Sequence, residues 1–160
     1  MTNPTRPQPR PAADYTRDEL AALLREGARI HGTPTDQAAV RLLNELDMVG
    51  TPPFAAHVTI QLTRDPDTGH MTVTALVTDW TALLEDRELP LTSPELTLLT
   101  LAGSYATGTP VSLRDCTLEV SISYSCCLAD AVLIATGVDR FLHVTARTPV
   151  PSSLSYGGAL

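Results

Sequence analysis

Apolar residues in the first third of the chain recur at helical spacing and predict two helices. Thr16 and Glu19 have the spacing of a capping box, in which the two side chains bond the first free amides of a helix. The apolar positions that follow lie along one stripe, and they are Leu20, Leu23, Leu24, Ala28 and Ile30. Gly32 should end this helix, and the Thr-Pro pair at 33–34 should begin another, which residues 50–53 end. Its apolar face holds Val40, Leu43, Leu46 and Met48 or Val49.

Apolar and polar residues then alternate strictly, which predicts an antiparallel β-hairpin. Val58, Ile60 and Leu62 belong to the first strand, and the second is formed by Met71, Val73, Ala75 and Val77. Directly opposed residues share a face of the sheet, so a loop from Pro66 to Gly69 is needed to match the two apolar faces. This register pairs Asp65 with His70, Leu62 with Val73, and Val58 with Val77. Gly69 should adopt the left-handed conformation that such a loop requires.

The rest of the chain is predicted to hold two short helices and then more strands. Asp79 can cap a helix that carries Trp80, although an extended segment fits that stretch nearly as well. Ser93-Pro-Glu95 begins a second helix, which Gly103 should end. Alternation over 116–126 predicts a strand, and residues 130–136 and 140–147 predict a hairpin around 137–139. One face of that hairpin carries Val132, Ile134, Leu142 and Val144, and the other carries Leu133, Ala135 and Phe141.

Together these elements predict the α+β class. An N-terminal helical hairpin packs on an antiparallel sheet of about five strands, with short helices between strands 2 and 3. Residues 1–14 form a disordered proline-rich arm, residues 15–148 a single domain, and residues 149–160 an irregular tail. The hydrophobic fraction of 43% in 160 residues suits one core and not two.

Charge narrows the classes of partner. The formal net charge is −7 and the isoelectric point is about 4.9, a balance that repels nucleic acid and anionic membrane surfaces. Only the N-terminal arm gathers basic residues, namely Arg6, Arg10 and Arg17. All eleven basic residues are arginine, which indicates a GC-rich bacterial genome. No apolar run reaches membrane-spanning length and no signal peptide is visible, so we expect a cytoplasmic protein.

The cysteines and histidines predict neither a metal site nor a cofactor. Cys116, Cys126 and Cys127 lack the C-x-x-C spacing of redox and zinc sites, and we expect reduced structural thiols, one of the adjacent pair being buried. The predicted register separates His57 from His70 by roughly 26 Å along the hairpin, which excludes a shared ion. His31 falls at a helix end, where it can favour the helix dipole.

His143 is the one histidine for which the pattern suggests chemistry. It lies in the middle of a predicted strand beside Phe141. If the strand over 116–126 is its neighbour, His143 would face Glu119, Ser121 or Ser123, a set of groups able to perform general acid–base catalysis. The glycine-rich phosphate loops and the G-x-S-x-G nucleophile motif are absent from the sequence.

Three functions follow from this reading. The first is a non-catalytic binding or assembly module that acts through protein–protein contacts and forms a homo-oligomer, with Leu133, Ala135 and Phe141 as its interface. The alternative is a small enzyme, of isomerase or cyclase type, or a small-molecule carrier with a sheet-lined pocket near His143 and Glu119. A nucleic-acid binder that uses the arginine-bearing arm is the third and least favoured.

Overall fold

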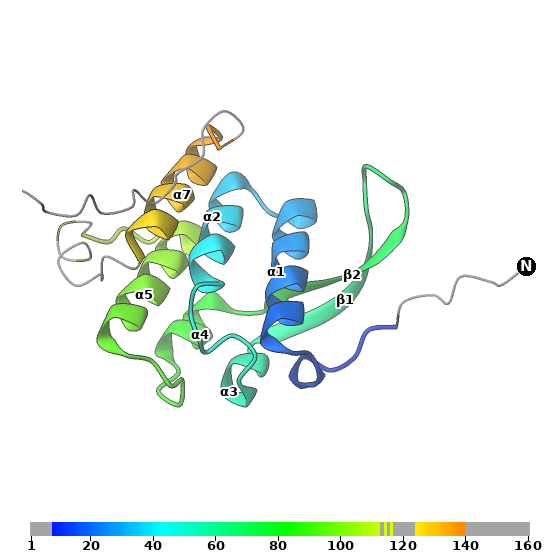
Figure 1. Cartoon of the computed structure of the whole chain (residues 1–160), viewed down its shortest axis with the longest axis horizontal. Helices are drawn as coiled ribbons and strands as arrows, with labels where there is room; N and C mark the ends of the chain where they lie inside the picture. The colour runs from blue at the N-terminus through cyan, green and yellow to red at the C-terminus, as the bar shows by residue number, and fades with distance from the viewer. Residues whose placement is uncertain (1–7, 113, 115, 117–123, 140–160) are drawn as a thin grey trace, which may run out of the picture.

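The protein is seen here as a computed structural model, which describes residues 8–112, 114, 116 and 124–139. Helices and one antiparallel pair of strands make it an α+β protein, as predicted. The order of elements is η1 (Ala12–Asp14), α1 (Arg17–His31), α2 (Pro34–Leu43), α3 (Pro52–Ala55), β1 (Val58–Arg64), β2 (Met71–Val77), α4 (Trp80–Glu85), α5 (Ser93–Thr107) and α7 (Ser125–Thr136) (Figure 1).

Both N-terminal helices begin where the capping signals predicted. The Thr16 hydroxyl accepts from the Glu19 amide while the Glu19 carboxylate accepts from the Thr16 amide at 2.8 Å. The same reciprocal pair, Thr33 with Asp36, opens α2. The predicted end of α2 was wrong: the helix stops at Leu43, and turns follow to residue 50. Apolar side chains of these turns are nevertheless buried. Their spacing along the chain resembles that of a helix, which is why the sequence predicted a longer one.

The β-hairpin has the predicted register. Val58 opposes Val77 and Leu62 opposes Val73, and the Asp65 amide donates to the His70 carbonyl at 2.8 Å. Gly69 has φ +71°, a left-handed conformation that side chains other than glycine adopt at a cost. The turn chemistry and the alternation of the two strands therefore determined this element locally.

α1 is the helix that packs against β2, and Gly27 makes the contact close. A Cβ atom on Gly27 would lie 2.1 Å from the carbonyl oxygen of Ala75, so only glycine fits there. α2 packs instead against α5 and α7 (Figure 1). The expectation that both N-terminal helices pack on the sheet was therefore wrong, because the second is enclosed by later helices.

The two later helices between β2 and residue 110 were also predicted. Asp79 accepts hydrogen bonds from the amides of Thr81 and Ala82 at 2.8 and 3.1 Å, which confirms the helical interpretation of that stretch. α5 continues past Gly103 to Thr107, so the predicted stop was wrong. Gly103 lies against the side chain of Leu84 within the core, where its lack of a side chain admits α4.

The prediction of about five strands was wrong. Residues 125–136, which include the expected strand over 130–136, form α7, and Gly137 at φ +72° is its C-cap rather than part of a hairpin turn. Apolar residues on both faces of an expected strand produce a continuous apolar run, and such a run also fits a helix. The two strands β1 and β2 form the only sheet among the described residues. The remaining expected strand positions, 117–123 and 140–147, lie outside them.

Candidate functional site

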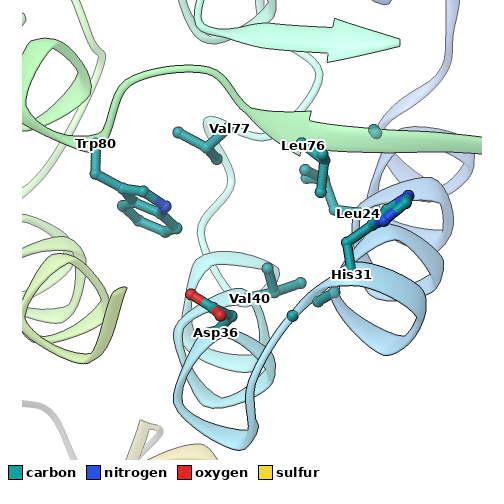
Figure 2. A pocket seen from close by; sticks show the side chains of 10 residues that line it. Leu24, His31, Asp36, Val40, Leu76, Val77 and Trp80 are labelled. Atoms are coloured by element: carbon teal, nitrogen blue, oxygen red, sulfur yellow. The ribbon is translucent and has the colours of Figure 1, made fainter. Parts of the chain in front are cut away.

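A small cavity opens where four elements meet: the end of α1, the start of α2, the edge of β2 and the start of α4 (Figure 2). Its volume is about 210 Å³. Six of its ten lining residues are aliphatic, and its polar side chains are Asp36, His31 and the indole of Trp80. The complete lining is Leu24, Ala28, His31, Gly32, Asp36, Val40, Ala75, Leu76, Val77 and Trp80.

Asp36 is held in place by the capping box of α2. Its Oδ2 accepts from the amide and from the hydroxyl of Thr33, both at 2.7 Å. Its Oδ1 accepts no hydrogen bond from any residue that the structure describes. The side chain is half-buried, so the cavity has a fixed carboxylate with one oxygen available to a ligand.

Trp80 lies on the same side of the cavity as Asp36 (Figure 2). It is the first residue of α4, and the Asp79 cap directly before it fixes the position of that helix. The indole is half-buried, and within the described part of the chain its Nε1 has no hydrogen-bond acceptor. A ring in this position offers an aromatic face and one N–H donor.

His31 stands on the opposite side, at the rim (Figure 2). Its Nε2 lies 3.2 Å from the amide nitrogen of Gln61 and 3.1 Å from the hydroxyl of Thr63. An amide nitrogen only donates, so Nε2 must be the acceptor. These two contacts hold the ring at the edge of the cavity.

The strand side of the cavity is the outer edge of β2. His57 pairs with Thr78, and Asp65 with His70, through ladder bonds of 2.8 Å. Hydrogen-bonded pairs alternate along an antiparallel ladder, so the peptide groups of Ala75 and Val77 point away from β1. The Ala75 carbonyl meets Gly27 of α1, and Val77 lines the cavity.

Two further hollows lie elsewhere. One of about 680 Å³ lies between α4, residues 86–91 and α5, and beside it His57 Nε2 contacts Asp86 Oδ2 at 2.7 Å. This hydrogen bond, together with the Glu88 amide, lowers the pKa of Asp86 below its usual range. The other, of about 170 Å³, lies between α1, α2 and α7. The His57–Asp86 pair joins residues 29 positions apart, and sequence spacing did not predict it.

The residues that the sequence singled out are only partly described. His143, Glu119, Ser121, Ser123 and Phe141 lie outside the described residues, so the acid–base hypothesis stays a prediction. Leu133 and Ala135 are half-buried side chains of α7. The sequence analysis did not single out Asp36 as a site residue, and it treated Trp80 only as part of a helix. Their convergence depends on how α2, β2 and α4 are arranged around the cavity, for which the sequence carries no signal.

The described cysteines are free thiols, and Cys127 is the buried one. Burial raises the pKa of Cys127 to about 11, and its Sγ donates to the Tyr124 carbonyl at 2.9 Å. That one of the adjacent pair is buried was predicted, although on a strand rather than a helix. In the described part of the chain, no group of three or more His, Cys, Asp or Glu side chains is placed to hold a metal ion.

Comparison with known proteins adds no identification. No protein-family model, no curated protein and no solved structure matches the chain. Among the described residues no helix is long and apolar enough to cross a membrane. The arguments for function therefore rest on the geometry of the chain itself.

Proposed function

We propose that the protein is a non-catalytic binding module and that the cavity between α1, α2, β2 and α4 is its ligand site. The observation that carries the proposal is the convergence of Asp36 and Trp80 on one small cavity, six of whose ten lining residues are aliphatic. An apolar wall with a few fixed polar groups is the usual construction of a small-molecule site. The volume of about 210 Å³ is below the roughly 300–1,000 Å³ of drug-sized sites, so the ligand is small.

The experiment is a fragment titration followed by backbone-amide NMR on the ¹⁵N-labelled chain. A panel of small cationic, neutral and anionic amphiphiles should shift amides that line the cavity, such as those of Gly32, Asp36, Val77 and Trp80. Shifts confined to the hollow beside Asp86, or no saturable shift with any member of the panel, would contradict the proposal.

A cavity-filling variant provides the matched control. Ala28 is buried and lines the cavity, so Ala28→Leu should weaken the binding of any fragment at least about tenfold by occupying its space. Ala22 lies on the exposed side of the same helix, and Ala22→Leu should leave binding unchanged. Equal binding by both variants would mean that the fragments bind elsewhere.

Self-association is a second candidate function, and α7 is the observation that favours it. Its sequence is apolar nearly all round, yet Cys127 and Ala131 are its only fully buried residues. Val132 is 44% exposed, and Val138 just beyond the helix is 37% exposed. A helix that is apolar on all sides is typical of one covered on all sides, and a second copy of the chain is the simplest cover.

Light scattering behind a sizing column tests the second candidate. We expect a dimer at tens of micromolar that Val132→Glu dissociates, because the substitution places an unpaired charge in the interface. Ala22→Glu, on an exposed face of α1, is the matched charge control and should leave the dimer intact. A wild-type monomer at that concentration would refute self-association and leave the ligand proposal standing.

A further inference from the structure

The charge and surface of the cavity identify the chemical class of its ligand. We infer that the cavity binds a small organic cation, in particular an alkylated ammonium group, with Asp36 as counter-ion and Trp80 as the aromatic wall. This inference rests on the proposed ligand site and adds the class of ligand.

Asp36 gives the cavity a negative wall. It is the only acidic residue in the lining, and no arginine lines the cavity. One Asp36 oxygen is engaged by Thr33, and the other accepts nothing from the described residues. A half-buried carboxylate of this kind is screened by solvent less than an exposed one.

Trp80 supplies the second attraction for a cation. The face of an indole ring is the most favourable aromatic surface for an ammonium group within ~6 Å. Trp80 and Asp36 lie on the same side of the cavity, so one bound group can approach both (Figure 2). The net charge of −7 further favours cations over anions at the surface of the protein.

The remaining wall favours an alkylated ammonium over a primary one. A primary ammonium has three N–H donors to satisfy. Among the lining side chains only Asp36 and His31 carry a hydrogen-bond acceptor, and six of the ten lining residues are aliphatic. Methyl groups on the nitrogen remove the need for acceptors and pack on Leu24, Val40 and the indole ring.

The test uses choline and its neutral carbon analogue, 3,3-dimethylbutan-1-ol, as probes of the full chain. Trp80 is the only tryptophan in the sequence, so its fluorescence reports directly on the cavity. Choline should change the emission saturably, with a dissociation constant on the order of 1 mM and at least about five times lower than that of the alcohol. Ala28→Leu should abolish the response to both probes.

Asp36→Asn is the decisive variant. Asparagine has the same size and still offers an oxygen to Thr33, and far-UV circular dichroism checks that the helices remain. It should weaken choline binding at least about fivefold and leave the alcohol unchanged. Asp18→Asn, at a side chain that is 94% exposed, removes the same charge and should have no effect.

Each outcome separates the two proposals. If the alcohol binds as tightly as choline, or if Asp36→Asn binds choline normally, the cation inference fails and the ligand site survives. If neither probe nor any fragment of the NMR panel binds at the cavity, both proposals fail. The choline-to-alcohol comparison is made on the unaltered chain, so it decides the inference even if Asp36→Asn does not fold.

Discussion

Gly27 shows how a single missing side chain positions the whole site. It brings α1 against the outer edge of β2, at the carbonyl of Ala75. Leu24, one turn before Gly27, and Ala28, the next residue, are thereby placed along the cavity, and both are buried. The backbone carbonyl cannot move aside without disturbing the strand, so the contact tolerates no Cβ atom.

Gly27→Ala should therefore destabilise the protein. Overpacking costs about 1–3 kcal/mol, and the better helix propensity of alanine returns up to about 1 kcal/mol. Gly69→Ala is the comparison: no atom lies within 4 Å of the added carbon, so only its positive φ costs free energy, about 1 kcal/mol. Asparagine tolerates that conformation, so Gly69→Asn should cost less than Gly69→Ala. Urea denaturation measures all three, and a Gly27→Ala variant more stable than wild type would contradict the close packing.

At the scale of elements, the tip of the β-hairpin is tied to α1 by one carboxylate. Asp65 Oδ1 accepts from the amides of Asp67 and Thr68 at 2.8 and 3.1 Å. Its Oδ2 pairs with Arg29 of α1, which also pairs with Asp67 at 2.8 Å. The pKa of Asp65 lies below its usual range, mainly because of the hydrogen bond from the Thr68 amide. The Asp67 amide and Arg29 lower it further.

This ion pair should make stability depend on pH in the acid range. The folded-state pKa of Asp65 is lowered, so its contribution is fully present above the unfolded pKa near 3.9 and disappears as pH falls through the folded value. Asp65→Asn retains the backbone bonds but has no charge to lose. The stability difference between wild type and this variant, measured by denaturant titration, should shrink from pH 6 towards pH 2.5. A difference that stays constant over that interval would show that the Asp65 charge contributes nothing.

At the scale of the whole molecule, α2 packs against other helices, while α1 packs against both α2 and strand β2 of the hairpin. α2 packs on both α5 and α7, and Arg41 of α2 bridges Glu45 and Asp130. Arg29 of α1 and Arg41 of α2 are thus paired with carboxylates. Because their charges are already neutralised by carboxylates, these arginines contribute little to the binding of an anion.

The protein should accordingly not bind duplex DNA at physiological salt. The net charge of −7 repels the phosphate backbone, and the ion pairs of Arg29 and Arg41 reduce the counterions that these two side chains could release. Fluorescence anisotropy with a labelled duplex at about 150 mM salt measures this. Binding below micromolar concentration would overturn the argument from charge.

Local signals in the sequence were sufficient to predict where several elements begin and how the two strands pair. The capping box of α1, the start of α2 at the Thr-Pro pair and the Asp79 cap of α4 formed as predicted, because each depends on residues at most three positions apart. The hairpin register also followed from alternation and from one turn, since a slip of one residue would turn every apolar side chain to the other face. These interactions depend on near neighbours in the chain.

Tertiary structure decided the rest. Residues 130–136 were predicted to form a strand with apolar side chains on both faces, yet they are helical in α7. A short apolar run fits a buried strand and a helix equally well, so its pattern could not distinguish the two. Which helix covers the sheet depended on Gly27 meeting Ala75, 48 positions away in the chain. Asp36 and Trp80 came together for the same reason: a shared cavity depends on how whole elements pack, and no spacing along the chain records it.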